Sequence, residues 1–270
     1  MDQSIRAKKS LGQHFLVDQN IARKIVSLLQ PQKGDVILEI GPGQGILTQF
    51  FLRTQARLVG VEVDERLAEI LRQKFAGAPN IEIIRADFRE FDFSGLKKES
   101  VRVKWLGNLP YNLTSVVLFR LVDAFPDVSR AVFMVQREVA ERIAAGPGTK
   151  EYGILSVLLQ TFFVSKLAFR VSAKVFRPVP AVESAVILFE KREEVRLNCD
   201  KSELTALVKR AFNQRRKLLR KSLREWIAPE AQRAVNFDFD RRPEEVPVEE
   251  WKRLCQQLRQ RKIHIPPLSG

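Results

Sequence analysis

The chain has 270 residues, 45% of them hydrophobic, which is enough to bury the core of one large domain and one small one. Lysine and arginine number 46 against 32 acidic residues, and the net charge of +14 favours a polyanionic partner, with nucleic acid ahead of a membrane surface; the alternative is a soluble protein whose surface is merely basic. The chain has only two cysteines, without Cys-x-x-Cys spacing, and two histidines, which argues against a metal site and a structural disulfide framework. It shows no apolar leader and no apolar run of ~20 residues, which argues against a membrane segment. Together these features predict a cytoplasmic protein.

The first predicted unit is a strand, a glycine turn and a helix. Helical periodicity over residues 20–30 precedes an apolar run at 36–40, and a second helical pattern covers 46–52. Between the last two, the spacing is Gly-x-Gly-x-Gly, unlike the Gly-x-Gly-x-x-Gly of dinucleotide-binding proteins, which argues against a bound pyrophosphate. Glycine lets the backbone approach a ligand closely, so we expect Gly41 and Gly43 to border one.

The next two predicted strands each end near an acidic residue. The strand at 58–63 carries Glu62, about 20 residues beyond the glycines, where an acid binds ribose hydroxyls in nucleoside-binding folds. The strand at 81–85 is followed by Asp87, whose carboxylate could accept a hydrogen bond from an adenine amino group. Either acid alone could be a solvated strand-end carboxylate. Together with the glycines they predict a crevice for an adenosine-containing cofactor.

A fourth strand, around residues 105–107, leads into Asn108-Leu109-Pro110-Tyr111. The amide oxygen of Asn108 and the carbonyl oxygen of Leu109 could each accept one N–H of an adenine N6 amine. Pro110 stiffens the turn, and Tyr111 offers a flat face on which an unpaired base can stack. The alternative is a strand-ending turn whose tyrosine covers the core.

The remaining patterns complete two domains. Helices at 116–122 and 154–162 and strands at 131–135 and 184–189 predict a doubly wound, mostly parallel α/β sheet. Beyond residue 198 the patterns are helical, at 202–226, 230–234 and 248–260. We therefore expect an α/β domain with a basic N-terminal extension over residues 1–195 and a small all-α domain over 196–270.

Residues 209–224 hold eight basic residues and no acidic one. A single helix with its apolar positions on one face would direct five cations outward: Arg215, Arg216, Lys217, Arg220 and Lys221. Phosphate contacts from such a helix would supply affinity and salt dependence with little sequence information. A solvated basic face is the alternative.

These motifs, in this order, resemble those of the ribosomal RNA adenine dimethyltransferases, and of their bacterial small-subunit branch in particular. The residues that carry the resemblance are 9–16, 39–45, 62, 87, 108–111 and 176–184, so it covers nearly the whole chain. It implies a Rossmann-like methyltransferase with S-adenosylmethionine as cofactor. It also implies a monomer that dimethylates N6 of two adjacent adenines in the 3′-terminal hairpin of 16S rRNA, in the 30S subunit or its precursor, with a role in the biogenesis of that subunit.

The resemblance also implies roles for individual residues. His14, Leu16 and Gly41 would line the cofactor site, with Glu62 on the ribose and Asp87 and Phe88 on the adenine. Asn108 would contact the methionine part and, with Leu109, the target amine, while Tyr111 and Phe176 would clamp the extruded base. His14 is a departure, because many relatives carry asparagine there. For Phe176 the alternative is a core residue before a proline-rich turn.

Three other functions compete with this interpretation. A large-subunit rRNA adenine methyltransferase more often has isoleucine in place of Leu109. A DNA adenine methyltransferase usually has Pro-Pro-Tyr at this motif. A non-catalytic RNA-binding assembly factor would have no need of Asn108 and the glycine loop, both of which are intact.

Overall fold

The computed structural model describes residues 7–8, 11–96 and 102–266 and divides the chain into two compact units. The first contains the residues up to 140 and residues 165–191, and the second contains residues 141–164 and those from 192 onward. The chain thus enters the second unit twice, whereas the sequence suggested a single boundary near residue 195. Within the described residues, no helix is both long and apolar enough to cross a lipid bilayer.

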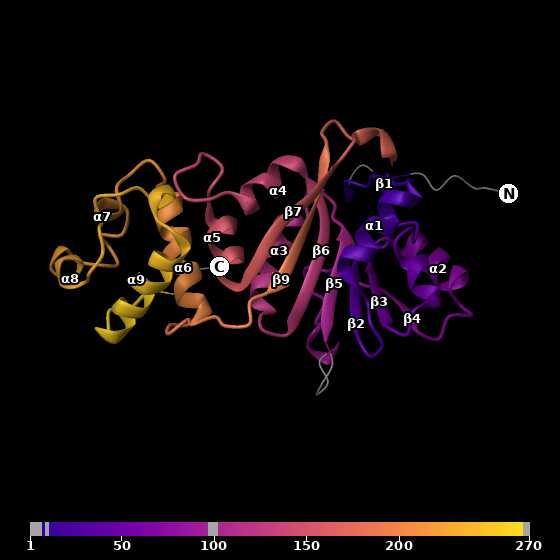
Figure 1. Cartoon of the computed structure of the whole chain (residues 1–270), viewed down its shortest axis with the longest axis horizontal. Coiled ribbons are helices and arrows are strands. Elements are labelled where there is room, and N and C mark those ends of the chain that lie inside the picture. Colours follow the sequence, from indigo (N-terminus) through magenta and orange to yellow (C-terminus); the bar gives the residue numbers. More distant parts are fainter. Residues whose placement is uncertain (1–6, 9–10, 97–101, 267–270) are drawn as a thin grey trace. The chain divides into compact units, whose positions relative to one another are not determined.

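The first unit is built on a seven-stranded sheet with the strand order β4-β3-β2-β5-β6-β9-β7 (Figure 1). The strands are β2 (Val36–Ile40), β3 (Arg57–Glu62), β4 (Ile81–Arg85), β5 (Val103–Asn108), β6 (Val128–Gln136), β7 (Phe163–Val171) and β9 (Ser184–Lys191). Strands β2 to β6 pair in parallel, and β9 is antiparallel to β6. The predicted doubly wound, mostly parallel sheet is confirmed.

Helices and a short ribbon complete this unit. The α-helices of this unit are α1 (Gln19–Leu29), α2 (Glu65–Lys74) and α3 (Thr114–Asp123), and its 3₁₀ turns are η2 (Thr48–Arg53), η3 (Ser94–Leu96) and η4 (Ala173–Val175). Helix α4 (Arg137–Ala144) has residues in both units. Strand β1 (Phe15–Leu16) pairs antiparallel with β8 (Phe176–Arg177). The helical pattern predicted at 46–52 is a 3₁₀ helix rather than an α-helix.

Sequence chemistry explains why these elements form. Asp18 caps α1 by accepting hydrogen bonds from the N–H groups of Asn20 and Ile21, and the apolar face of that helix is buried. Strand β2 is buried along its whole length, as expected of a central parallel strand covered on both faces. The chain runs outward from β2 through β3 to β4 and then returns to β5 on the other side of β2, so the switch point of the sheet lies between β2 and β5.

The second unit is helical. It contains α5 (Ile154–Phe162), α6 (Lys201–Asn213), α7 (Leu219–Ser222), α8 (Pro229–Ala234), the 3₁₀ turn η5 (Pro243–Glu245) and α9 (Val248–Gln260). Helix α5 is apolar on nearly every side and packs against both α6 and α9. The buried hydroxyl of Tyr152, just before α5, donates to the carbonyl of Val246 at 3.0 Å. These contacts explain why residues 141–164 belong to this unit.

The prediction of a continuous helix over residues 202–226 is wrong. Helix α6 ends at Asn213, residues 214–218 form a turn, and α7 is one short helix of four residues. Backbone N–H groups that a continuous helix would bond internally find partners in a distant segment instead. Those of Leu219 and Arg220 donate to the carbonyls of Arg241 and Phe239, each at 2.9 Å. The basic residues of this stretch are therefore not on one helical face.

Candidate active site

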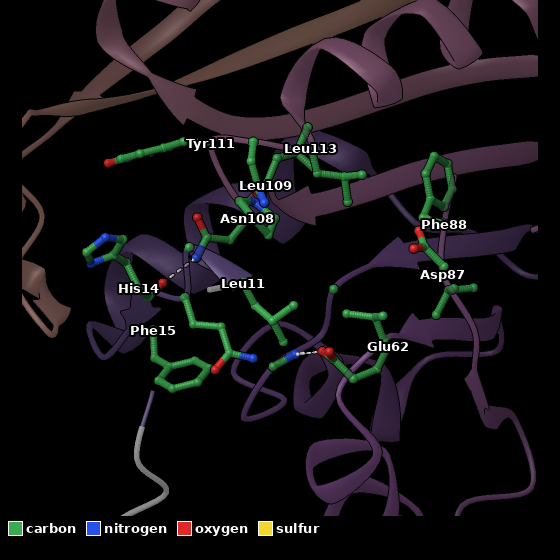
Figure 2. Close-up of a pocket in the computed structure, with 18 of the residues that line it drawn as sticks. Leu11, His14, Phe15, Glu62, Asp87, Phe88, Asn108, Leu109, Tyr111 and Leu113 are labelled. Atoms are coloured by element: carbon green, nitrogen blue, oxygen red, sulfur yellow. Dashed lines mark hydrogen bonds between the residues drawn. The ribbon is translucent and has the colours of Figure 1, made fainter. Parts of the chain in front are cut away.

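A cavity of about 290 Å³ lies at the carboxyl ends of the central parallel strands (Figure 2). It brings together ten of the predicted site residues: His14, Gly41, Gly43, Glu62, Asp87, Phe88, Asn108, Leu109, Tyr111 and Phe176. Leu16 does not line the cavity; its side chain is 3% exposed and belongs to the hydrophobic core. The predicted crevice is thus present, but one of its expected wall residues is buried in the hydrophobic core instead.

The glycine loop after β2 forms one wall of the cavity. Gly41 and Gly43 have φ angles of +65° and +59°, a backbone conformation that L side chains rarely adopt. A Cβ atom on Gly43 would also lie 3.3 Å from the ring of Phe15. Side chains here would be strained and would crowd the cavity, so the loop presents its backbone to whatever occupies the site.

Glu62, at the end of β3, is held by two backbone N–H groups. Gly43 donates to one of its carboxylate oxygens at 3.0 Å and Asp64 to the other at 2.9 Å (Figure 2 shows the first). Burial raises the pKa of Glu62, although these hydrogen bonds oppose the shift. Each oxygen keeps a second lone pair, so the carboxylate can still accept two hydroxyl groups.

Asp87 and Phe88 follow β4 and form another wall. Arg89 donates to both carboxylate oxygens of Asp87, and this pairing lowers the pKa of Asp87. The Phe88 ring is 3% exposed and meets the indole of Trp105 edge-on, with ring centroids 5.6 Å apart. An ionised acceptor beside an apolar surface suits the edge of a base that carries an amino group.

The turn after β5 is fixed by its own hydrogen bonds. The side-chain Nδ2 of Asn108 donates to the carbonyl of His14 at 3.0 Å (Figure 2), which leaves Oδ1 as the acceptor that can serve a ligand. The N–H of Leu109 donates to Met134 on β6 at 3.0 Å, and the carbonyl of Pro110 accepts from Thr114 at the start of α3. The acceptor groups of the turn are therefore preorganised.

Two aromatic residues predicted to clamp a base differ in exposure. Tyr111 is half-buried, and its ring lies 5.7 Å from that of His14 with an interplanar angle of 31°. The His14 ring is itself tied through Nδ1 to the carbonyl of Pro178 at 2.8 Å. Phe176 lines the cavity but is only 2% exposed, because it packs into the core through the β1–β8 ribbon.

The sequence did not single out several cavity residues. Val63 lies directly after Glu62 and is 45% exposed, so it offers an uncovered apolar surface to a ligand. Gln13 and Leu11 reach the cavity from the N-terminal segment, and Leu113 reaches it from the turn before α3. The sequence carried no signal for Val63, because there it only continues the apolar run of the predicted strand at 58–63.

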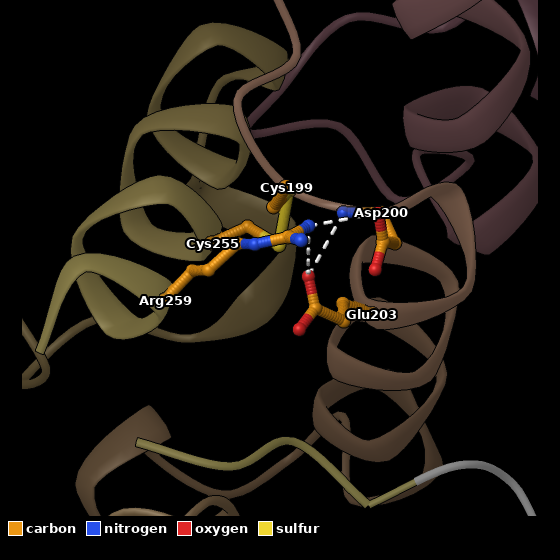
Figure 3. The surroundings of a disulfide bond; sticks show 5 residues. All are labelled: Cys199, Asp200, Glu203, Cys255 and Arg259. Atoms are coloured by element: carbon orange, nitrogen blue, oxygen red, sulfur yellow. Dashed lines mark hydrogen bonds and ion pairs between the residues drawn. A yellow bond between two sulfur atoms is a disulfide. The ribbon is translucent and has the colours of Figure 1, made fainter. Parts of the chain in front are cut away.

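The two cysteines belong to the second unit, and they form a disulfide there although the sequence argued against a structural disulfide framework. Cys199 and Cys255 form a disulfide with their Cα atoms 6.1 Å apart (Figure 3). Arg259 on α9 also pairs with Asp200 at 2.8 Å and Glu203 at 3.3 Å, at the start of α6. The two cysteines are 56 positions apart in the sequence and come together because α9 packs on α6. The number and spacing of cysteines do not reveal that packing. The cytoplasmic expectation loses the support it drew from cysteine content.

Comparisons with known proteins agree with this geometry. The family model described as ribosomal RNA adenine dimethylase matches residues 4–260. A protein of Parabacteroides distasonis named ribosomal RNA small subunit methyltransferase A is 42% identical over 93% of both chains. A protein of the same name from Porphyromonas gingivalis is 41% identical over 95% of this chain and 99% of its own.

Solved structures extend the comparison. The crystal structure of the 23S rRNA methyltransferase ErmE matches 91% of this chain and all of its own, with a TM-score of 0.69 and 26% identity. A dimethyladenosine transferase from Plasmodium falciparum has the same fold, with a TM-score of 0.79 over 93% of this chain and all of its own, at 23% identity.

Proposed function

Because the chain belongs to the ribosomal RNA adenine dimethylase family, we propose that it transfers methyl groups from S-adenosylmethionine to N6 of adenines in small-subunit rRNA. The targets are two adjacent adenines in the 3′-terminal hairpin of 16S rRNA, each dimethylated. The substrate is the 30S subunit or its precursor, and the enzyme acts in the cytoplasm as a monomer without a membrane partner. The observation that supports this most directly is the Asn108 amide, which lines the same cavity as Glu62 and whose nitrogen is held by the carbonyl of His14.

The cavity fits an adenosine-containing methyl donor. Glu62 can accept from the two ribose hydroxyls, and Asp87 can accept from the adenine amine. The backbone at Gly41 and Gly43 leaves room for the chain that joins ribose to amino acid. Bound there, S-adenosylmethionine supplies a sulfonium-activated methyl group, so the protein's task is positioning.

Asn108 and Leu109 act on the other reactant. Adenine N6 is a poor nucleophile because its lone pair is conjugated with the ring. In the first transfer, acceptors at Asn108 Oδ1 and the Leu109 carbonyl hold its two N–H groups and stabilise the positive charge that develops on nitrogen. In the second transfer the monomethylated amine has one N–H to donate, and the other position must accommodate its methyl group. The methylated amine then loses a proton to water, so this step requires no side-chain base. Tyr111 stacks on the extruded base, at ~1–3 kcal/mol per base.

One experiment tests the activity and the substrate together. The protein is incubated with labelled S-adenosylmethionine and undermethylated 30S subunits, and the modified nucleotides are mapped. We expect label on N6 of two neighbouring adenines near the 3′ end of 16S rRNA. Label on 23S rRNA instead would favour the large-subunit activity, and binding to subunits without transfer would favour a non-catalytic assembly factor.

The raised pKa of Glu62 predicts that cofactor affinity depends on pH. Only the carboxylate can accept from both ribose hydroxyls, so affinity should fall as the pH drops through a midpoint above 4.5, the ordinary value for glutamate. The folding stability of the cofactor-free protein should depend on pH in the opposite sense. Because the pKa of Glu62 is raised in the folded state, this group stabilises the fold below the ordinary value of 4.5, and the stabilisation is lost as the pH rises through the folded-state pKa. Calorimetry with S-adenosylhomocysteine across this range measures the affinity.

Two variants control this measurement. Glu62→Ala should lose at least several-fold in affinity at neutral pH, because hydrogen bonds to a charged acceptor disappear. Glu62→Gln should bind more weakly than wild type at neutral pH and show a flatter pH profile. Equal affinity and an equal profile in all three proteins would remove Glu62 from the site.

The structure revises which cations are available for rRNA docking. Arg215 is partly buried, donates to the carbonyl of Lys150 at 2.7 Å and lies 3.6 Å from the carboxylate of Glu244. Arg220 pairs with Asp240 at 2.8 Å. Three cations of the predicted set are exposed and have no ion-pair partner among the described residues: Arg216, Lys217 and Lys221. These three carry the docking proposal.

A hollow in the same region strengthens it. Its volume is about 570 Å³, and its border includes four basic side chains: Arg220, Lys221, Arg224 and Arg233. Asp240 is the one carboxylate that the described part of the chain places on that border. An open, basic hollow suits backbone phosphates, and such contacts release counterions when they form.

Reversal of Arg216, Lys217 and Lys221 to glutamate should weaken binding to the small subunit and flatten its salt dependence, by about one unit of slope for each phosphate that is no longer neutralised. Affinity for S-adenosylhomocysteine should barely change, because these residues lie outside the unit that holds the cavity. The matched control reverses three other exposed arginines of the helical unit, Arg196, Arg253 and Arg261. Equal subunit affinity in both triple variants across a salt titration would show that residues 214–224 are only a solvated basic face.

A further inference from the structure

We propose that Arg120 is a positioning residue for the cofactor. It ties the loop of residues 87–93, which carries the side chains expected to recognise the adenine, to helix α3, which begins at the catalytic turn. By fixing that loop, Arg120 sets the selectivity of Asp87 for a base with a 6-amino group. The inference rests on the proposed function, because that function supplies the adenine.

The guanidinium of Arg120 contacts the loop in two ways. It lies over the rings of Phe88 and Phe93, at 4.9 and 4.8 Å from their centroids. It also donates to the backbone carbonyls of Phe88 and Phe91. A planar fork of donors can reach two carbonyls while its face covers an aromatic ring, and the single ammonium of a lysine cannot.

The loop depends on such contacts because it contains no strand or α-helix. The carbonyl of Asp87 accepts from the N–H groups of Glu90 and Phe91, which closes one turn. Phe93 packs edge-on against Trp105 of β5, with ring centroids 5.1 Å apart. Beyond these local ties, Arg120 joins two carbonyls of the loop to a helix.

The electrostatic setting is consistent with a charged tie. Burial lowers the pKa of the Arg120 guanidinium, and Asp123 and Asp92 oppose that shift. Because the ordinary value of arginine is so high, the side chain stays protonated at neutral pH. A half-buried cation that donates to carbonyls restrains the loop more strongly than a neutral donor would.

Helix α3 connects Arg120 to the turn at residues 108–111, which is expected to hold the target adenine. Its first residue, Thr114, donates through both its N–H and its hydroxyl to the carbonyl of Pro110, at 3.1 Å in each case. Arg120 lies in the last turn of the same helix. One rigid element of ten residues thus holds the turn for the target amine at its start and the adenine loop at its end.

The test compares two ligands by calorimetry: S-adenosylhomocysteine and its inosine analogue, in which a 6-oxo group replaces the amine. Wild type should favour the amino ligand. In Arg120→Met the affinity for S-adenosylhomocysteine should fall roughly tenfold while the analogue loses less, so that selectivity shrinks. Arg120→Lys, which keeps a charge over the rings, should restore part of the selectivity. Hydrogen exchange should show faster exchange of the amides in residues 87–93 of Arg120→Met.

A matched control removes a different arginine of the same unit. Arg72 donates through Nε to the carbonyl of Ile83 at 3.1 Å, on β4 and outside the loop, so Arg72→Met should keep the wild-type selectivity. Unchanged selectivity in Arg120→Met, or an equal loss for both ligands, would overturn the positioning role. Failure of wild type to bind S-adenosylhomocysteine would instead count against the proposed cofactor, and the exchange rates of the free protein would still report whether Arg120 holds the loop.

Discussion

Asn108→Ala is expected to slow methyl transfer by roughly 10²–10³-fold, because an acceptor aimed at the charge developing on the target nitrogen is removed. The variant should fold, since the side chain is only half-buried and its one hydrogen bond to a described residue goes to the carbonyl of His14. Single-turnover transfer from labelled S-adenosylmethionine to undermethylated 30S subunits measures the effect. Calorimetry with S-adenosylhomocysteine reports separately whether the cofactor site survives.

Tyr111 provides the comparison for this variant. Tyr111→Phe keeps the flat ring and should retain much of the activity, whereas Tyr111→Ala should be impaired mainly because base stacking is weakened. Transfer at the wild-type rate by Asn108→Ala would show that the amide does not orient the amine. A parallel collapse of S-adenosylhomocysteine binding in that variant would place its main role on the cofactor instead.

Gly107→Ala is expected to destabilise the protein by ~3 kcal/mol, roughly 6–12 °C in Tm, and to reduce activity with it. The added Cβ would lie 2.8 Å from the carbonyl oxygen of Ile40 on β2 and 2.9 Å from the side chain of Leu109. Backbone cannot yield as a flexible side chain does, so β2 and β5 would have to separate just before the turn at residues 108–111. Thermal unfolding, with cofactor present and absent, measures the loss.

Gly77→Ala is the matched control, because a Cβ there would meet nothing within 4 Å and the residue does not have a positive φ. Its stability should be unchanged or slightly raised, since alanine restricts the unfolded chain. If both variants unfold at the wild-type temperature, the close approach of β2 and β5 at Gly107 is not maintained in solution.

The sequence was a good guide wherever function depends on strand ends. Gly41, Glu62, Asp87 and Asn108 each follow or end an apolar run, and parallel strands place such positions at one edge of a sheet, so the cavity could be predicted from spacing. The bounds of the predicted strands of the sheet and of α1, α3 and α5 were close because strong apolar periodicity decides them locally. Strand β7 was missed because it follows α5 directly, without a turn that would mark the change.

What could not be predicted depends on contacts between distant segments. Leu16 was expected in the cavity, but its strand pairs with Phe176 of β8 and draws its side chain into the core. The helix over 202–226 breaks because carbonyls near residue 240 compete for its backbone N–H groups. Arg215 was expected to point outward, but its side chain donates to the carbonyl of Lys150. In each case the deciding partner lies at least 19 residues away in the sequence, beyond the reach of a periodicity argument.

Helix α5 also bears on how the chain is made and how it can be cut. About 100 residues separate this helix from the end of α9, so a ribosome elongating at ordinary rates would synthesise its last packing partner roughly 5–20 s later. Until α6 is made its apolar faces have neither partner to cover them, and for the rest of that interval they still lack α9. It is therefore the segment of the helical unit on which a chaperone would act first. A fragment ending at residue 195 would leave it uncovered for good, so a cut at that point produces an aggregation-prone protein rather than an isolated catalytic domain.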